Sequence, residues 1–339
     1  MTRHYCCYFD DRYLPRGVAM IRSLRRFEPD ACIWLLCLSE RCHEIMTRLA
    51  EPGVRLMRLV ELETADPEVA QSRSSRSLVE YYFTCTPALV CHILKQVEPG
   101  GFVTYVDGDL YFFSNPHRLY EELGSGAVGI IAHRFAPAAR HLERFGIYNV
   151  GWMTFRNDDR GRATAGWWRE RCNEWCYDVL DGDRFADQKY VEQFARRFDG
   201  IVVLENPGAN LAPWNLGRHR LALDRGTVIV DEREPLVFFH FHGIRELGGA
   251  LYIAEHLRYG APFNIFIRRY IYRPYIERLA AIVAETAPLA QRRKGTLARH
   301  ASRESSMLNR LIGKWRRPIK NAMALLTLQF ILVVKGRAF

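Results

Sequence analysis

The chain has 339 residues, of which 48% are hydrophobic and 25% charged, and a formal net charge of +10 at pH 7. This apolar fraction is sufficient for a large core and excludes a disordered chain as the default interpretation. The segment from Arg292 to Phe339 holds 12 basic residues and one acid, which leaves 36 basic and 37 acidic residues before it. A nearly neutral body argues against nucleic-acid binding, which needs cations along the whole binding face.

The N-terminal residues and the cysteines both indicate the cytoplasm. The first residues read MTRHYCCYFDDRY, and their apolar stretch is too short for a signal peptide and runs directly into two acids. The nine cysteines form an odd set without CxxC pairs or the Cys/His spacing of a zinc module. We therefore expect a cytoplasmic protein with reduced, mostly buried cysteines.

The first half of the chain alternates short β-branched or aromatic runs with longer amphipathic stretches, and further strands follow. The predicted strands are 5–9, 33–38, 54–58, 102–106, 129–132, 149–155, 201–204, 228–230 and 236–239. The predicted helices are 15–27, 40–49, 77–97 and 162–179, the first opened by a proline whose missing N–H costs nothing at a helix start. This pattern predicts an α/β fold, with a mixed sheet flanked by helices.

Composition changes clearly at one place only. Near residues 288–306, Gln, Arg, Lys, Gly, Thr and Ser replace the apolar pattern. The sequence therefore predicts a folded domain over 1–287, a linker over 288–306 and a basic helical tail over 307–339.

An apolar strand ends in Asp107-Gly108-Asp109, with a second apolar run directly behind it. Carboxylates that follow a buried strand lie in the crevice where open α/β sheets bind ligands. Two such charges repel each other unless a cation joins them, and Mg²⁺ or Mn²⁺ is commonly shared between carboxylates and substrate phosphates. The pair therefore predicts a metal–diphosphate site, where Gly108 would allow a close approach of the backbone.

Two other interpretations of this segment stay open. Asp-Gly is a strong hairpin signal, so the aspartates could mark a turn between two paired strands. A phosphatase with an aspartate nucleophile also begins with a strand and Asp-x-Asp, but that class expects Thr two residues after the second Asp. Tyr111 occupies this position here.

His240 and His242 follow another apolar run and, on an extended strand, point to the same side. Either imidazole could complete a metal site, and the alternative is a pair of hydrogen-bonded structural histidines. Between the two sites, segments 148–155 and 185–190 place polar groups in apolar surroundings. Their structural alternatives are a strand bulge and a helix N-cap.

Six short motifs occur in a fixed order, namely Asp10-Asp11-Arg12-Tyr13, Asp107-Gly108-Asp109, Asn149-Val150-Gly151, Asp187-Gln188, Trp214-Asn215 and His240-Phe241-His242-Gly243. Over roughly residues 5–245, this order resembles the GT-A-fold glycosyltransferases of glycosyltransferase family 8 and their bacterial relatives. The resemblance implies a Rossmann-like GT-A domain and a retaining transfer from a nucleotide-diphosphate sugar, most often a UDP-sugar. It also implies a divalent metal, usually Mn²⁺, with Mg²⁺ as the other candidate.

The resemblance also implies roles for individual residues, carried over motif by motif. Metal ligands would be Asp107, Asp109 and His240. Donor-binding residues would be Asp10, Tyr13, Asp107, Gly108, Asp109, Asn149, Gly151 and His242. In this set Asp10 and Tyr13 would hold the base, His242 would contact the diphosphate, and Asn149 and Gly151 would line the sugar pocket. The catalytic pair would be Asp187, on the donor sugar, and Gln188, near the anomeric carbon.

Two positions depart from the family pattern, and both concern cations near the diphosphate. The family often has Arg after Tyr-Tyr in the helix before Asp-x-Asp, where this chain has Phe83. It also has Lys after His-x-x-Gly, where Glu246 stands in this chain, close to Arg245. Three residues could substitute for the missing cations, namely Arg134, Lys189 and Arg245.

From residue 308 onward, apolar residues recur at steps of three or four, which indicates one helical face with basic residues off it. A basic amphipathic helix with a tryptophan suits the surface of an anionic membrane. The apolar stretch 322–334 is shorter than the roughly 20 residues that span a bilayer. The alternative is a helix packed against the catalytic domain or another subunit.

Together these features predict a cytoplasmic glycosyltransferase, peripheral at the inner face of the cell membrane. It would transfer a sugar to a saccharide or lipid-linked acceptor in polysaccharide or lipopolysaccharide assembly, without binding nucleic acid. The alternatives are a non-catalytic nucleotide-sugar-binding or membrane-associated protein that retains the fold, and an unrelated hydrolase that cleaves the donor without a metal.

Overall fold

The computed structural model describes residues 3–247, 251–290, 330–334 and 337–338. Backbone contacts divide the chain into two compact units, one ending at Phe241 and one beginning at His242. The predicted linker and the tail up to residue 329 lie outside the described residues. The end of the predicted tail helix is wrong, because Phe330–Val334 forms strand β15. Its β-branched and aromatic residues suit a strand, and β15 pairs with β14, Leu251–Ile253.

Seven strands of the first unit form one sheet in the order β3-β2-β1-β4-β7-β6-β8. Strands β3, β2, β1 and β4 are parallel to one another, β7 is antiparallel to β4 and β6, and β8 is parallel to β6. The bounds are β1 His4–Phe9, β2 Cys32–Cys37, β3 Val54–Arg58, β4 Phe102–Val106, β6 Val128–Ala132, β7 Tyr148–Arg156 and β8 Ile201–Val203. This sheet confirms the predicted mixed α/β architecture.

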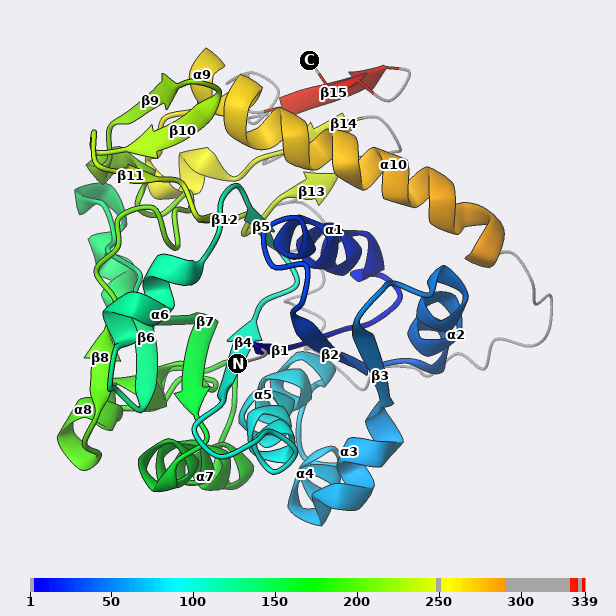
Figure 1. The fold of residues 1–339 in the computed structure, drawn as a ribbon, viewed down its shortest axis with the longest axis vertical. Coiled ribbons are helices and arrows are strands. Elements are labelled where there is room, and N and C mark those ends of the chain that lie inside the picture. Colours follow the sequence, from blue (N-terminus) through cyan, green and yellow to red (C-terminus); the bar gives the residue numbers. More distant parts are fainter. Residues whose placement is uncertain (1–2, 248–250, 291–329, 335–336, 339) are drawn as a thin grey trace, which may run out of the picture. The chain divides into compact units, whose positions relative to one another are not determined.

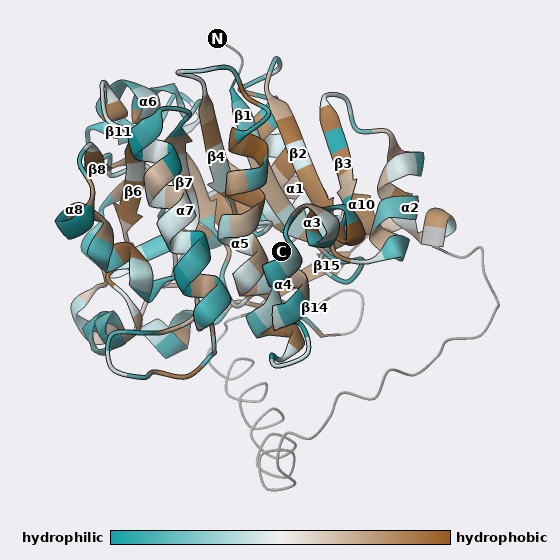
Figure 2. Ribbon diagram, turned by 90° about the horizontal axis from the view of Figure 1, so that it is seen from below, coloured by the Kyte–Doolittle hydropathy of each residue, from teal (hydrophilic) through white to brown (hydrophobic). Residues whose placement is uncertain are grey.

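Helices cover both faces of this sheet, which is why its central strands are nearly continuous apolar runs. Figure 1 shows α5, Leu78–Leu94, beside α7, Asp159–Glu174, on one face, with α1, Leu14–Arg25, on the other. Figure 2 shows hydrophobic residues along β2 and β4, behind α5 and α7. The other α-helices of this unit are α2 Glu40–Leu49, α3 Leu59–Ala65, α4 Pro67–Ser72, α6 His117–Leu123 and α8 Phe194–Arg197.

Short elements complete the first unit. Strand β5, Leu110–Phe112, pairs with β12, Phe238–His240. A three-stranded sheet contains β9 Leu221–Asp224, β10 Thr227–Val230 and β11 Glu234–Pro235. The 3-10 helices are η1 Pro137–Phe145, η2 Lys189–Gln193 and η3 Leu216–Arg218. All nine cysteines lie in this unit, and seven of them are buried, as predicted.

The second unit combines an antiparallel sheet with helices. Its strand order is β13-β14-β15-β16, with β13 at Arg245–Glu246 and β16 at Arg337–Ala338. Its helical segments are η4 His256–Tyr259, α9 Ile265–Ile267, the π-helical η5 Arg268–Tyr272 and α10 Arg273–Ala290. Among the described residues of both units, none of the helices has the length and hydropathy that a bilayer crossing requires.

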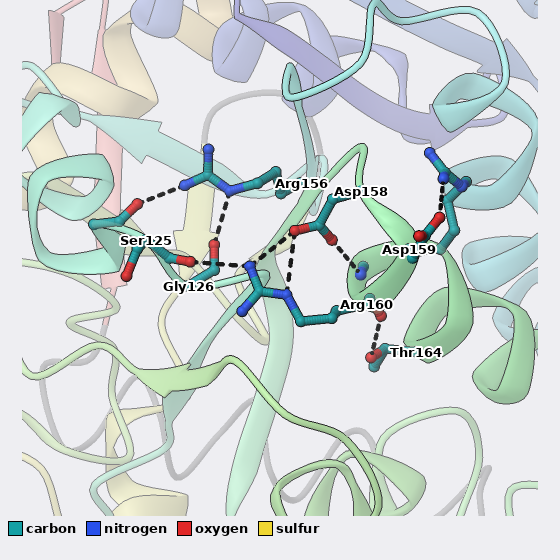
Figure 3. Close-up of polar contacts among 10 residues, drawn as sticks. Ser125, Gly126, Arg156, Asp158, Asp159, Arg160 and Thr164 are labelled. Carbon is teal, nitrogen blue, oxygen red and sulfur yellow. Dashed lines mark hydrogen bonds and ion pairs between the residues drawn. The ribbon is translucent and has the colours of Figure 1, made fainter.

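Helix α7 begins at a tight junction with β7, shown in Figure 3. The Asp158 carboxylate accepts a hydrogen bond from the Gly161 N–H at 2.8 Å, which caps the helix. Arg160 donates to the same carboxylate at 2.9 Å and to the Ser125 carbonyl at 3.2 Å (Figure 3). A Cβ atom added to Gly161 would lie 2.0 Å from the Arg156 carbonyl oxygen. The junction therefore has no space for a side chain at Gly161.

We expect Gly161→Ala to lower the free energy of unfolding by about 2–3 kcal/mol, because overpacking against a fixed backbone strains the junction. The matched control is Gly166→Ala on the same helix, where an added Cβ meets nothing within 4 Å. This control should gain about 0.5–1 kcal/mol, since alanine favours helix more than glycine does. Urea unfolding followed by circular dichroism measures both changes. Equal effects of the two substitutions would contradict the described junction.

Candidate functional site

The carboxyl ends of β1 and β4 lie side by side, because these strands are parallel neighbours with Cys6 opposite Tyr105. The turn after β1 carries Asp10 and Tyr13, and the turn after β4 carries the Asp107–Asp109 pair. Two of the six motifs, nearly 100 positions apart in the sequence, therefore meet at one edge of the sheet. This edge is where open α/β sheets bind ligands.

The aspartate pair does not belong to a hairpin. The predicted turn between two strands is present, since the pair lies between β4 and β5, but β5 pairs with β12, so the expected hairpin pairing is wrong. The Leu110 N–H donates to the Asp107 carbonyl at 3.2 Å, and this turn directs the chain out of the main sheet. The β5–β12 pairing places His240 opposite Leu110, and the Phe241 N–H donates to the Asp109 carbonyl at 2.9 Å. The fold thus brings His240 to the aspartates.

Three side chains converge at this point. His240 Nε2 lies 3.0 Å from Asp109 Oδ1 and 3.8 Å from Asp107 Oδ2. Asp109 and His240 are buried, whereas 32% of the Asp107 side chain is exposed. Burial raises the pKa of Asp107, and Asp109 raises it further, although His240 opposes both. Burial lowers the pKa of His240, but the two carboxylates outweigh it and the net shift is upward. The arrangement therefore favours a positive charge between the carboxylates.

A bulge in β7 places glycine against these donors. The register between β6 and β7 shifts between Ile130 and Ile131, and the Gly151 carbonyl accepts from the Asp107 N–H at 3.0 Å. A Cβ atom added to Gly151 would lie 2.9 Å from His240 Cε1 and 3.0 Å from Asp107 Oδ2. Asn149 Oδ1 accepts from the Gly151 N–H at 3.1 Å, and this bond stabilises the bulge. The bulge alternative is therefore confirmed, and it forms part of the site.

The donor types at this point suit a divalent cation, and Asp109 and His240 belong to a group of side chains that could hold a metal ion. Neighbouring ligands of an octahedral ion with bonds of about 2.1 Å lie about 3 Å apart, and two of the separations here are 3.0 and 3.8 Å. Carboxylate oxygens suit Mg²⁺ and Mn²⁺, and imidazole nitrogen suits transition-metal ions. The absent side chain of Gly151 keeps the space beside these donors open.

The turn after β1 contacts Asp109, a role that the sequence reasoning missed. Asp10 Oδ1 accepts from the N–H groups of Arg12 and Tyr13 at 3.1 and 3.0 Å, which fixes the turn. The Tyr13 hydroxyl donates to Asp109 Oδ2 at 2.7 Å, and the Arg16 guanidinium lies 4.6 Å from the Tyr13 ring centroid. The motif order contains no signal for this contact, because only the adjacency of β1 and β4 creates it.

Gly108 lies beside the Tyr13 ring, and its predicted close approach to a ligand stays a prediction. A Cβ atom added there would lie 3.4 Å from Tyr13 Cδ1, which is an ordinary van der Waals contact. Within the protein, the tighter glycine contact is at Gly151, where an added Cβ would lie 2.7 Å from Asn149 Oδ1.

Asp187 is buried close to this site, in the loop before η2. Burial raises its pKa to about 7, a hydrogen bond with the Thr86 hydroxyl opposes this, and the charge of Asp107 adds to it. Trp168 Nε1 donates to the Asp187 carbonyl at 2.8 Å, which ties the loop to α7. An acid that titrates near neutral pH beside other carboxylates is typical of a functional site.

Gln188 is held by a different loop. Its Nε2 donates to the Phe145 carbonyl at 3.1 Å, and a Cβ atom added to Gly146 would lie 3.0 Å from the same nitrogen. Gln188 is the residue before η2, but its side chain makes no capping bond, so the N-cap alternative is wrong. The Gln188 amide therefore fixes the loop at 145–146.

The Trp214-Asn215 motif supports His240. The Trp214 ring lies edge-on to the His240 ring, with centroids 5.0 Å apart. Asn215 Nδ2 donates to the carbonyls of His133 and Asn210 at 2.9 and 2.8 Å, and so fixes the loop that carries Trp214.

The candidate substitute cations are engaged elsewhere. Arg134 donates to backbone carbonyls of the loop at 205–209, including Asn206 at 3.0 Å. Lys189 donates to the Arg144 carbonyl at 3.0 Å. Arg245 belongs to the second unit, where it pairs with Glu255 at 3.3 Å. His242, whose diphosphate role stays a prediction, also belongs to that unit, and its ring lies 6.3 Å from the Tyr259 ring. Arg134 and Lys189 thus hold their own loops.

The sequence has relatives among curated proteins, although no protein-family model matches it. It is 30% identical over 245 residues to the uncharacterized protein YfnD of Bacillus subtilis (strain 168). The matched residues make up 71% of this chain and 78% of YfnD. The chain belongs to the YfnD family. Uncharacterized protein YfnF of the same bacterium is also similar to it, with 29% identity over 252 residues, 72% of this chain and 82% of YfnF.

Solved structures with a likeness of fold to this YfnD family member include glycosyltransferases. One is the galactosyltransferase LgtC in complex with donor and acceptor sugar analogues, at 15% identity and a TM-score of 0.45, covering 87% of this chain and 98% of LgtC. Another is the glycosyltransferase GlyE of Streptococcus pneumoniae TIGR4, at 18% identity and a TM-score of 0.41, covering 64% of this chain and 48% of GlyE.

Proposed function

We propose that the chain is a metal-dependent, retaining glycosyltransferase. It transfers a sugar from a nucleotide-diphosphate sugar, a UDP-sugar first of all, to a saccharide or lipid-linked acceptor. The observation that carries this proposal is the convergence of Asp107, Asp109 and His240 where β1 and β4 end. The ordered motifs that resemble glycosyltransferase family 8 support it.

Access to the three donors favours a cation that is shared with a substrate. Asp107 is partly exposed, and Gly151 presents no side chain to the same space. When Mg²⁺ or Mn²⁺ is bound by protein, some of its coordination positions are commonly filled by phosphate oxygens of the substrate. An imidazole among the protein ligands favours Mn²⁺ of these two ions. A cation bound there would neutralise negative charge on the departing diphosphate.

The neighbouring residues take the remaining roles. The nucleotide base binds against the turn that Asp10 fixes. Tyr13 then lies between the base and Asp109, to which its hydroxyl donates. Asn149 and Gly151 line the sugar side, and His242 contacts the diphosphate. Asp187 holds a hydroxyl of the donor sugar, because its buried carboxyl lies near Asp107 and can donate or accept a hydrogen bond around neutral pH.

Gln188 directly follows Asp187 in the same loop. We place its amide near the anomeric carbon, held by the Phe145 carbonyl. The chain's part in the transfer is then positioning, since the pocket holds an acceptor hydroxyl beside the sugar carbon while the leaving group is stabilised. The basic tail would bring the enzyme to an anionic membrane surface on the cytoplasmic side, where lipid-linked acceptors occur.

A donor-turnover assay tests this function. Purified protein is incubated with UDP-, GDP- and dTDP-sugars, with Mn²⁺ or with EDTA, and release of the nucleoside diphosphate is measured. We expect one donor class to be turned over only with the metal. Turnover that persists in EDTA would indicate a metal-independent hydrolase, and metal-dependent binding without turnover in the presence of acceptors would indicate a non-catalytic sugar-nucleotide-binding protein.

A further inference from the structure

Thr86 differs from the other helical threonines in the bonds that its hydroxyl makes. A threonine inside a helix can donate to the carbonyl four residues earlier. Five threonines in the described helices do so, namely Thr47, Thr64, Thr84, Thr164 and Thr286. Within the described part of the chain, Thr86 of α5 makes no such bond, and its hydroxyl contacts residues outside the helix. Its direction is therefore set by partners beyond α5.

The contacts of Thr86 lead to the candidate site. Its side chain is fully buried, and its Oγ1 lies 3.1 Å from the Tyr8 hydroxyl oxygen and forms a hydrogen bond with the Asp187 carboxyl. Tyr8 belongs to β1, and its ring centroid lies 5.8 Å from that of Tyr105, whose hydroxyl donates to Asp107 Oδ1 at 2.8 Å. Helix α5, strand β1 and the loop before η2 thus meet at one buried hydroxyl.

This hydroxyl can orient the Asp187 side chain. A threonine hydroxyl has one hydrogen and two acceptor positions, and its burial without partners would be costly. When the Tyr8 hydroxyl donates to Thr86 Oγ1, the single hydrogen of Thr86 is left for the Asp187 carboxyl. Trp168 Nε1 already holds the Asp187 backbone carbonyl at 2.8 Å. The bond with Thr86 therefore restrains the part of Asp187 that can still rotate.

We propose that Thr86 is a positioning residue for the donor sugar. Its hydroxyl holds one oxygen of the Asp187 carboxyl, and so keeps the other oxygen in a fixed direction to bind a hydroxyl of the sugar. A fixed group of this kind distinguishes sugars that differ in one hydroxyl, because the wrong sugar leaves a buried polar group unpaired. The inference rests on the proposed function, which assigns Asp187 to the donor sugar.

The test compares a nucleotide with its sugar adducts, because the sugar is the part that Asp187 would hold. UDP, UDP-glucose and UDP-galactose are titrated calorimetrically, with Mn²⁺, into the full-length wild type and its Thr86→Val and Thr86→Ser variants. Valine removes the hydroxyl and keeps the shape of the side chain, whereas serine keeps the hydroxyl. If the wild type does not bind UDP, GDP or dTDP and the glucose and galactose adducts of each are used in the same way.

The matched control is Thr164→Val in α7. Thr164 is also a fully buried helical threonine, and its hydroxyl donates to the Arg160 carbonyl at 2.9 Å (Figure 3). This substitution removes a buried hydroxyl of the same kind without touching Asp187. It therefore measures what the loss of such a hydroxyl costs in general.

We expect Thr86→Val to lower the affinity for the better-bound sugar nucleotide by about tenfold, since the loss of a hydrogen bond to a charged group costs about this much. The preference between the two sugars should narrow, and the affinity for the nucleotide alone should not change. Thr86→Ser and Thr164→Val should resemble the wild type. In an Asp187→Asn background, Thr86→Val should have little further effect, because both changes disrupt the same interaction.

Several outcomes would overturn the inference. An equal loss of affinity for nucleotide and sugar nucleotide would indicate general damage to the site. A folded Thr86→Val variant that binds as the wild type does, or additive effects of Thr86→Val and Asp187→Asn, would show that Thr86 does not act through Asp187. If Thr86→Val does not fold, Tyr8→Phe removes the partner of the Thr86 hydroxyl, and the same selective loss must then appear at a smaller size. A wild type that binds none of the nucleotides with Mn²⁺ would instead overturn the proposed function.

Discussion

Gly151→Ala is expected to lower Mn²⁺ affinity about 100-fold, at the upper end of what changes beside metal ligands cause. The added Cβ would lie 2.7 Å from Asn149 Oδ1, 2.9 Å from His240 Cε1 and 3.0 Å from Asp107 Oδ2. Two of these side chains are proposed ligands, and the third stabilises the bulge, so all three would have to move. Calorimetric titration of Mn²⁺ into the metal-free variant measures the loss.

The control for this prediction is Gly108→Ala, between the two aspartates. Its added Cβ meets Tyr13 only at ordinary contact distance, so the variant should keep most of its Mn²⁺ affinity. On sequence alone the opposite ranking would be expected, because Gly108 lies inside the metal motif. If Gly108→Ala loses the metal and Gly151→Ala keeps it, the described geometry of the bulge is wrong.

Asp187→Asn is expected to make the protein more stable at pH 8 and to reduce transferase activity strongly. Burial raises the pKa of Asp187 to about 7 from an ordinary value of 3.8. Between about pH 4 and 7 the folded protein therefore keeps a proton that the unfolded chain releases, so this carboxyl lowers stability as the pH rises and has its full effect above about pH 7. The asparagine side chain does not ionise and avoids this cost.

The size of the effect follows from the same titration. Between pH 5 and pH 8 the wild type should lose on the order of 2–3 kcal/mol of unfolding free energy through this residue, and Asp187→Asn should not. Urea unfolding at both pH values, with EDTA present to remove metal, measures the difference between the two proteins. Parallel pH profiles of wild type and variant would show that Asp187 is ionised in the folded protein throughout this range.

The sequence predicted the main sheet well, because its elements have strong and regular patterns. Strands such as Val54–Arg58 and Phe102–Val106, and helix Glu40–Leu49, have the predicted bounds. Helices α3, α4 and α6 were missed because they have only six or seven residues each, too few for a periodic pattern. The boundary between the two compact units, at residues 241 and 242, was also missed. Packing defines this boundary, and the amino-acid composition does not change there.

The site was predictable in its parts but not in its assembly. The apolar strand before Asp107 and the apolar run before His240 both indicated polar groups at strand ends. The pairing of β5 with β12, which joins them, could not be read from either segment, since register depends on long-range packing. The contacts of Tyr13 with Asp109 and of Tyr105 with Asp107 were missed for the same reason, and Tyr105 resembled an ordinary core residue of its strand.

The most direct test of a metal–diphosphate site is calorimetric titration of UDP into the protein with and without Mn²⁺, repeated with the Asp107→Ala/Asp109→Ala double variant. We predict binding that requires Mn²⁺ in the wild type and is lost in the double variant, because the two carboxylates hold the cation that the diphosphate shares. If UDP does not bind, GDP and dTDP are titrated in the same way. A wild type that binds none of the three nucleotides in a metal-dependent manner, or a double variant that binds as the wild type does, would contradict this account.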